Sequence, residues 1–247
     1  MNEKLLEATL QEHITELKVR LIKCIVLFLI ACCVGFYFAN EIYNFLATPL
    51  VKAMKSESRK LIFTGITEGF MTHMRVSIFF GLSITFPYIV LQVYRFLAPG
   101  LYRNERKVIL PFVLISVLLF FLGICMAYFF VAPIACKFFI TFEGTIQYDS
   151  HNIPVVLEAR ISEYLSTIIQ LIVCFGIVFQ LPIIILVLCK LGILSIATLK
   201  KYRRHAIVMN FIIAAILTPP DVISQIMLAL PMVLLYEIAI LIVRRCL

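Results

Sequence analysis

The chain has 247 residues, of which 62% are hydrophobic and only 15% are charged, and its mean hydropathy is +1.04. Soluble domains are about 45–50% apolar and about 25% charged, so this composition excludes a soluble globular protein and indicates an integral membrane protein. The formal charge of +8 does not indicate a nucleic-acid ligand, because an excess of Lys and Arg in a polytopic membrane protein reports first on its topology.

The cysteines and the N-terminal residues bear on metal binding and on whether the first apolar run is removed. Most of the eight cysteines lie inside apolar runs without the spacing of metal ligands, so we expect neither a metal nor another cofactor. The N-terminus is acidic, with Glu3, Glu7 and Glu12, and it lacks the basic start of a cleavable signal peptide. The first apolar run is therefore expected to stay in the membrane.

The N-terminal third predicts one span followed by an external loop. Apolar residues recur between polar ones over residues 1–23, which predicts a short amphipathic helix along the membrane surface. Residues 24–40 carry no charge and are just long enough to cross a hydrocarbon core of about 30 Å. Residues 41–74 are too mixed to span, and we expect an external loop with short helices near the interface.

Two spans and two loops follow. Residues 76–94 form the second predicted span, which Pro87 should kink. The loop at residues 95–107 is basic, and the third span, residues 108–136, is longer than a bilayer requires and should tilt or project. Residues 137–163 form a second external loop, which is polar and slightly acidic.

The last third predicts three further spans. The fourth contains Gln180 and Pro182 and should be kinked, and a basic loop at residues 190–204 follows it. A Thr-Pro-Pro-Asp turn makes the fifth and sixth spans a tight hairpin. The fifth span can reach only about 20 Å, so we expect a short pair of helices with a recessed outer turn. The three spans are residues 164–189, 205–217 and 222–243.

The distribution of Lys and Arg orients these spans. If both termini are cytoplasmic, fifteen cations lie on that side and seven lie outside. The sequence thus predicts an all-α fold, in which residues 1–247 form a single polytopic membrane domain of six transmembrane helices, with both termini cytoplasmic and the last two helices short. No internal repeat is visible, which argues against the inverted halves of many transporters.

Two acids stand out in the cation-rich cytoplasmic segments around the first two spans. Glu16 precedes Arg20 by four residues, and Glu105 lies among the cations of the 95–107 loop. Each has a plainer explanation, namely an intrahelical ion pair for Glu16 and local charge neutralisation for Glu105. Together they fit a further role, because carboxylates bind guanidinium groups by charge-assisted hydrogen bonds. We therefore predict a docking surface for a positively charged peptide.

Placing a polar side chain inside a membrane span costs free energy, so each such residue in the predicted spans needs a structural or functional explanation. Gln180 can bond carbonyl groups that the following proline leaves without a donor, Asp221 can cap the sixth helix, and Glu237 can pair locally near the end of that helix. Alternatively, Gln180, Gln225 and Glu237 would form the relay of a small-molecule or ion transporter. An enzyme is not indicated, because no Ser/His, paired Asp or metal-ligand set falls at one depth.

Three segments carry a family resemblance: residues 13–21 (HITELKVRL), 96–106 (FLAPGLYRNER) and 217–225 (LTPPDVISQ). They resemble the signature segments of TatC, the receptor subunit of the twin-arginine protein translocase, and the last segment is the most specific. The resemblance covers nearly the whole chain, including six spans with both termini inside.

The resemblance implies a receptor, not an enzyme, for signal peptides that bear paired arginines. It implies that the partners are the single-span subunits TatA and TatB and further copies of the chain itself. Together they would move folded cargo proteins with the protonmotive force. The implied location is a bacterial inner (cytoplasmic) membrane or an organellar membrane. By motif match, it implies signal-peptide binding by Glu16, Lys18, Phe96, Arg103 and Glu105, and translocation or partner contacts by Pro49, Gln180, Asp221 and Gln225.

Two positions depart from the family pattern. Lys18 stands where the family usually has Arg, which keeps the charge but loses the bidentate guanidinium. Gln180 stands where the family has an intramembrane Glu. An amide cannot carry a proton charge, so proton-linked chemistry is not expected at this position.

Overall fold

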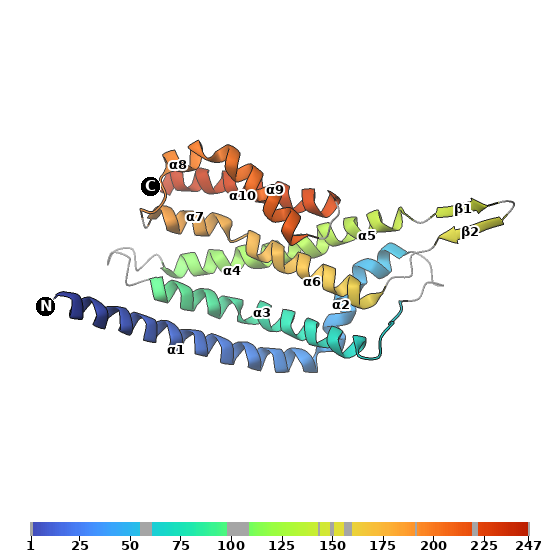
Figure 1. The fold of residues 1–247 in the computed structure, drawn as a ribbon, viewed down its shortest axis with the longest axis horizontal. Coiled ribbons are helices and arrows are strands. Elements are labelled where there is room, and N and C mark those ends of the chain that lie inside the picture. Colours follow the sequence, from blue (N-terminus) through green and yellow to red (C-terminus); the bar gives the residue numbers. More distant parts are fainter. Residues whose placement is uncertain are drawn as a thin grey trace. The chain divides into compact units, whose positions relative to one another are not determined.

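The structure, a computed structural model, describes residues 2–54, 61–97, 109–142, 144–148, 151–155, 160–190, 192–218 and 222–246. Nearly all of these residues lie in helices (Figure 1). The chain forms two compact units: a first unit of Met1–Phe38 with Ser77–Leu118, and a second unit of Ala39–Val76 with Leu119–Leu247.

The first unit contains α1 (Asn2–Tyr37), most of α3 (Glu68–Leu97) and the first part of α4 (Ile109–Met126). Because α1 is one continuous helix of 36 residues, the predicted separate helix on the membrane surface over residues 1–23 is wrong. No Pro or Gly occurs before Gly35, so nothing in the sequence interrupts the helix once it has started.

Small residues allow α1 and α3 to approach closely. A Cβ atom at Gly81 of α3 would lie 2.5 Å from Cys32 Sγ and 3.2 Å from the Cys32 backbone nitrogen on α1, so a side chain there would force Cys32 to shift. Small residues serve the same purpose in other membrane helix pairs. This close contact holds the two helices that carry the candidate site described below.

The second unit contains α2 (Ala39–Met54), a π-helical turn (Ala127–Val131), α5 (Ala132–Ile140), α6 (Ile161–Val178), α7 (Leu181–Lys190), α8 (Ile196–Lys201), α9 (Arg203–Leu217) and α10 (Val222–Cys246). Helix α10 packs against α7, α8 and α9, and α2 packs against α5 and α6.

A small hairpin in the second predicted external loop departs from the all-α prediction. Strands β1 (Gly144–Tyr148) and β2 (His151–Val155) pair antiparallel, with Gly144 opposite Val155 and Tyr148 opposite His151. The described residues are otherwise helical or in short connections, so the predicted helical membrane architecture is confirmed.

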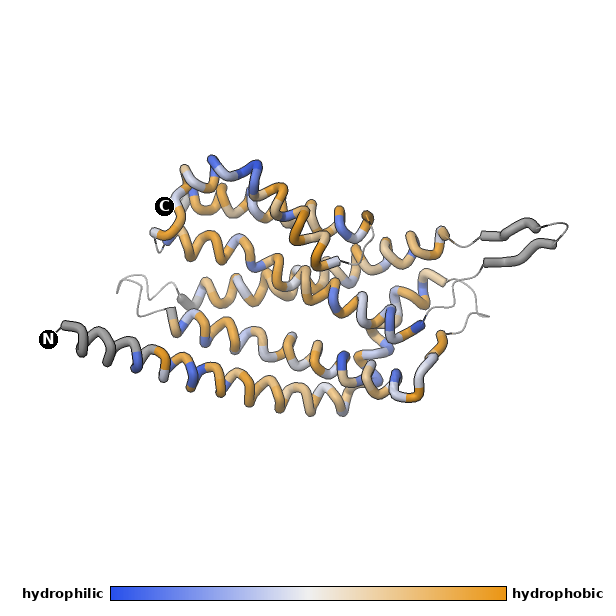
Figure 2. The backbone as a smooth tube through the Cα atoms, in the orientation of Figure 1, coloured by the Kyte–Doolittle hydropathy of each residue, from blue (hydrophilic) through white to orange (hydrophobic). Residues whose placement is uncertain are grey.

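Among the described residues, five helical segments are long and apolar enough to cross a membrane: α1, α3, α4 with α5, α6 with α7, and α10. Helix α9 has 15 residues, or about 22 Å, and is the short fifth span of the prediction. The predicted shortness of the sixth span is wrong, because α10 has 25 residues. The helix continues through the basic pair near its C-terminal end, where the helix dipole stabilises positive charge. Figure 2 shows hydrophilic residues at the start of α9 and at the first turn of α6, with hydrophobic residues along the helices between.

Two of the long segments are interrupted where a proline removes a backbone donor. The N–H of Ala132 donates to the carbonyl of Ala127, five residues earlier, which produces the π-helical turn just before Pro133. Helices α6 and α7 are separated by Phe179 and Gln180, so the kink predicted in the fourth span is confirmed as a break.

Pro49 determines how α2 is held. A proline has no N–H, so the carbonyl of Phe45, four residues earlier, has no helical donor. The Tyr128 hydroxyl donates to that carbonyl at 2.6 Å, and its ring stacks on Phe45 with centroids 4.4 Å apart. The Tyr164 hydroxyl donates to the next carbonyl, that of Leu46, at 3.0 Å. The buried proline thus supplies the acceptor that ties α2 to the π-helical turn.

We expect Tyr128→Phe to destabilise the protein by about 1–3 kcal/mol, because the Phe45 carbonyl loses its donor. In a Pro49→Ala background a backbone N–H at position 49 restores a donor, so the same change should cost less by about 1 kcal/mol. Thermal unfolding of the four proteins in detergent measures both costs. Tyr236→Phe, which removes a hydroxyl bonded to the Leu199 carbonyl at 2.9 Å, should cost the same in both backgrounds. Equal costs for Tyr128→Phe would contradict this explanation.

Candidate functional site

The first unit holds a guanidinium group between two helices. Arg20 donates through Nη2 to the Glu16 carboxylate, one turn earlier on α1, and through Nη1 to the main-chain carbonyl of Gln92 on α3 at 3.2 Å. The Glu16 and Arg20 side chains are 37% and 20% exposed, so water reaches the pair. The intrahelical ion pair considered from the sequence is therefore present, and it is also tied to a second helix.

An apolar groove between α1 and α3 lies beside this pair. Its volume is about 510 Å³, and Arg20 and Phe96 both line it, together with mostly apolar residues that include Leu17, Leu21, Cys24 and Val93. Phe96, which the resemblance implies to be a signal-binding aromatic, therefore belongs to the same site as the Glu16–Arg20 pair. Lys18 is exposed on α1.

Three predicted site residues, Arg103, Glu105 and Asp221, lie outside the described residues, so the roles assigned to them stay predictions. The Pro219-Pro220 turn before Asp221 also lies outside. The structure thus describes the α1 half of the predicted docking surface together with Phe96 at the end of α3.

The other predicted residues lie in the second unit, on different elements. Pro49 is buried in α2. Gln180 is 8% exposed at the break between α6 and α7, where its backbone carbonyl accepts from the N–H groups that begin α7. Gln225 of α10 donates through Nε2 to the Phe211 carbonyl of α9 over 3.5 Å, which is a long and weak contact. These three residues therefore lie at separate places in the second unit.

The short helix α9 is held by one contact at each end, and neither contact was predicted from the sequence. Gln170 of α6 donates through Nε2 to the carbonyl of Leu217, the last residue of α9, at 2.8 Å. Gln170 follows Ile161 by nine positions, so α9 ends roughly 14 Å along α6. At its other end, Arg203 of α9 pairs with Glu237 of α10, and the predicted local pairing of Glu237 is therefore wrong.

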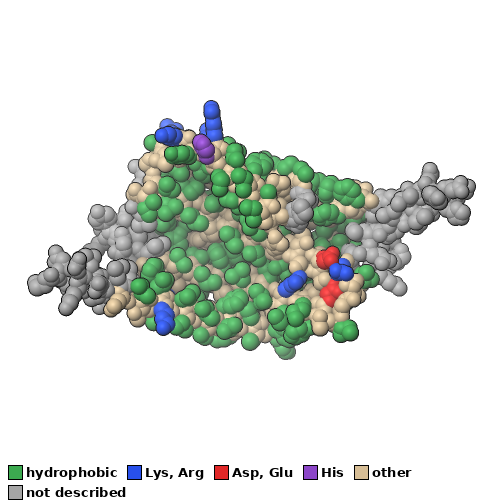
Figure 3. All heavy atoms as spheres, viewed as in Figure 1, with side chains coloured by type: hydrophobic (Ala, Val, Ile, Leu, Met, Phe, Trp, Pro, Cys, Tyr) green, Lys and Arg blue, Asp and Glu red, His purple; other side chains and the backbone are tan. Residues whose placement is uncertain are grey.

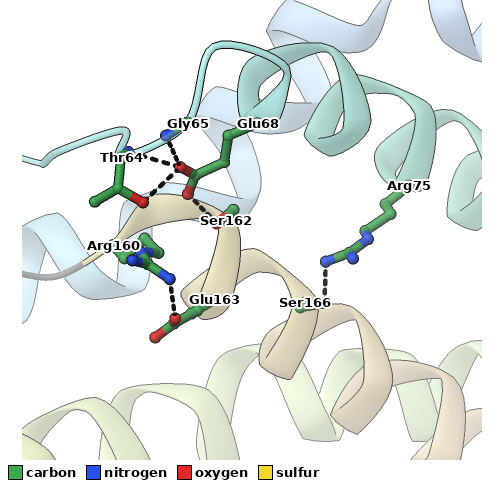
Figure 4. A network of polar contacts seen from close by, with 8 residues as sticks. All are labelled: Thr64, Gly65, Glu68, Arg75, Arg160, Ser162, Glu163 and Ser166. Carbon is green, nitrogen blue, oxygen red and sulfur yellow. Dashed lines mark hydrogen bonds and ion pairs between the residues drawn. The ribbon is translucent and has the colours of Figure 1, made fainter.

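A carboxylate at the first residue of α3 joins three segments of the second unit (Figure 4). Glu68 accepts hydrogen bonds from the Ser162 hydroxyl of α6, from the N–H groups of Thr64 at 2.7 Å and Gly65 at 3.0 Å, and from the Thr64 hydroxyl at 3.1 Å. The carboxylate thus ties the start of α3 to the preceding segment and to α6.

Further polar contacts continue this cluster. Arg160 pairs with Glu163 at 2.7 Å, and Arg75 donates to the Ser166 hydroxyl at 2.6 Å (Figure 4). Arg160 and Glu163 also line a cavity of about 690 Å³, with Tyr164 and several apolar side chains. Figure 3 shows Lys, Arg and His side chains of the second unit near the α8–α9 end, and acidic side chains together with Lys or Arg side chains at the α6 end, with apolar side chains between.

No group of three His, Cys, Asp or Glu side chains within the described part of the chain is placed to hold a metal ion.

The family model described as Sec-independent protein translocase protein (TatC) matches residues 12–231. The chain belongs to the TatC family. TatC of Rickettsia prowazekii is 47% identical over 94% of this chain and 91% of its own length, and TatC of Escherichia coli K12 is 36% identical over 92% and 85%, respectively.

Solved TatC structures agree with this assignment. A crystal structure of the twin-arginine translocase receptor TatC matches with a TM-score of 0.79 at 36% identity, covering 94% of this chain and 98% of that chain. A second crystal structure, of the same receptor in DDM, matches with a TM-score of 0.81 at 37% identity over 93% and 98%.

Membership of the TatC family establishes the general function. The chain is a multi-pass membrane protein of the twin-arginine, Sec-independent protein translocase, and it is not an enzyme. The relatives give no support to the small-molecule or ion transporter considered from the polar residues of the spans.

Removing the charge of Glu68 should destabilise the second unit. Glu68→Gln should lower the melting temperature in detergent, because one acceptor oxygen becomes an amide donor and the remaining hydrogen bonds lose their charge assistance. Glu163→Gln, which removes an exposed carboxylate of the same cluster, should have only a small effect. Equal changes in melting temperature for the two variants would contradict this account.

Proposed function

We propose that this chain is the core receptor of the translocase and binds the signal peptides of folded cargo proteins through their paired arginines. The observation that carries the proposal is the Glu16 carboxylate, which is partly exposed and already hydrogen-bonded to a guanidinium beside an apolar groove. The same groove contains Phe96, so one site offers a carboxylate, a main-chain carbonyl and an aromatic ring.

Two arginines require more acceptors than Glu16 alone provides. We assign the second carboxylate to Glu105, with Arg103 beside it in the 95–107 loop and Lys18 on α1. The surrounding cations repel loosely basic chains, so recognition depends on placing each guanidinium against its acceptor and not on net charge. The excess of Lys and Arg on the side that carries both termini supports a cytoplasmic position for this surface, in the bacterial inner membrane.

We also assign partner contacts to the second unit. Pro49, Gln180, Asp221 and Gln225 would contact the single-span subunits TatA and TatB or a second copy of the chain during transport driven by the protonmotive force. Helix α9, at about 22 Å, is shorter than a hydrocarbon core of about 30 Å, which favours local thinning of the bilayer where partners assemble. Gln180 acts there as a hydrogen-bonding amide, since it carries no titratable proton.

Removing either carboxylate should weaken signal-peptide binding. Glu16→Gln and Glu105→Gln each lose a charged hydrogen bond of about 1.5–3 kcal/mol, which corresponds to roughly ten- to hundredfold lower affinity. Binding of a fluorescent twin-arginine peptide to the detergent-purified protein measures this loss. Glu163→Gln, a carboxylate of the second unit, serves as the matched control and should bind like wild type. Wild-type affinity in both test variants would refute the assignment of these acids.

The amide of Gln180 should matter more than its volume. A Glu at this position can still accept and donate hydrogen bonds when protonated, whereas Leu leaves buried partners without a hydrogen bond. Gln180→Glu should therefore retain export of a twin-arginine reporter protein and Gln180→Leu should reduce it, while both bind signal peptide normally. Full export by the Leu variant, with normal recovery of TatB in the purified complex, would argue against any role for the amide.

A further inference from the structure

We propose that Arg20 occupies the arginine position of the signal-peptide site in the unliganded protein, and that an arriving arginine binds by displacing it. The inference rests on the proposed function, because it takes Glu16 as an acceptor for a signal-peptide arginine. It assigns to Arg20 a role of its own: Arg20 sets the affinity for Glu16 that a ligand needs in order to displace it.

The hydrogen bonds of Arg20 are those that an arginine ligand would need. One guanidinium nitrogen donates to the Glu16 carboxylate on α1, and another donates to the Gln92 carbonyl on α3 at 3.2 Å. A planar guanidinium presents several donors in a fixed fork, so acceptors on two different helices can hold both of its edges at once. The protein therefore contains a formed guanidinium site, and its own side chain fills it.

Arg20 is held weakly enough to be exchanged. Its pair with Glu16 is an i, i+4 contact on one helix, and both side chains are partly exposed to solvent. Pairs of this kind contribute little to stability, because water screens the charges and competes for the hydrogen bonds. The long, flexible stem of Arg20 also lets the displaced guanidinium turn into water while its methylene groups stay on the apolar surface.

The groove explains how a ligand can bind while the exchange takes place. Arg20 lines one part of it, and the rest is almost wholly apolar, with Phe96, Leu21 and Ile25 among its walls. Apolar residues that adjoin the arginines of a signal peptide can enter this groove and bring a guanidinium next to Glu16. A soluble basic segment without apolar neighbours cannot use the groove, so Arg20 keeps its place against it.

The test compares peptide binding by the full chain in detergent before and after removal of the competitor. Arg20→Met keeps an unbranched apolar stem in the groove and removes the guanidinium. We expect a roughly two- to tenfold gain in affinity for a synthetic peptide with paired arginines before an apolar stretch, as expected for removing a partly exposed pair. A twin-lysine peptide should gain by the same factor, because the competitor belongs to the protein and not to the ligand.

Two controls separate displacement from other effects of the charge change. Lys23→Met removes one exposed cation from the same helix without touching Glu16, and it should change affinity less than twofold. In a Glu16→Gln background, Arg20→Met should give no gain, since there is no carboxylate to release. If Arg20→Met does not fold, Arg20→Lys, which keeps the charge but loses the fork, should show a smaller gain in the same direction.

The outcomes are distinct. Weaker binding by Arg20→Met would make Arg20 a residue that positions Glu16 or the ligand, and an equal gain by Lys23→Met would make the effect one of general charge; either result overturns the inference. Failure of the proposed function is recognised separately, because Glu16→Gln alone would then leave binding of the twin-arginine peptide unchanged, whatever Arg20→Met does.

Discussion

A peptide carbonyl that loses its helical donor needs another partner, and where water is excluded that partner must come from the protein. This requirement governs the breaks in the second unit. The Phe45 carbonyl, which Pro49 leaves without a helical donor, accepts from Tyr128, and the Leu217 carbonyl at the end of α9 accepts from Gln170. Each donor comes from a different helix, so each local defect becomes a point of attachment between helices.

The same reasoning explains how a helix too short to cross the membrane is kept in a defined place. A free apolar helix of about 22 Å could slide along its neighbours, because dispersion contacts alone specify position poorly. Helix α9 is tied at its first residue by the Arg203–Glu237 ion pair and at its last by Gln170. Its depth is thus set by polar contacts at both ends, while apolar packing against α10 fills the space between.

Features that depend on neighbouring residues were predictable from the sequence, and features that depend on distant ones were not. Charge-free runs predicted the spans, and the Thr-Pro-Pro turn predicted the short α9. The unbroken course of α1 was not predictable from polarity, because the polarity changes near residue 23 although no helix breaker occurs there. The hairpin was read only as a polar loop, since two strands of five residues give a weak alternating pattern.

Some residues of the candidate site were also predictable from their sequence context, and others were not. Glu16 and Phe96 could be chosen from their sequence context, and the i, i+4 spacing indicated the pair with Arg20. The Gln92 carbonyl could not be predicted, because its role comes from the packing of α3 against α1 and leaves no mark in side-chain type. Glu68 carried a partial signal as an acid at a helix start, but its bond to Ser162 joins residues 94 positions apart.

The continuity of α1 has a mechanical consequence. Its 36 residues form a helix about 54 Å long, and the proposed recognition residues Glu16 and Arg20 share this helix with the whole first span. Much of the span exposes apolar side chains such as Leu29 and Ile30, so few internal contacts oppose a small movement. A tilt of about 5° about Glu16 displaces Tyr37, which lies about 32 Å away along the helix, by about 3 Å. With Glu16 and Arg20 as the proposed ligand site, its occupancy can be transmitted to the other end of α1 by a tilt of the whole helix, without any refolding.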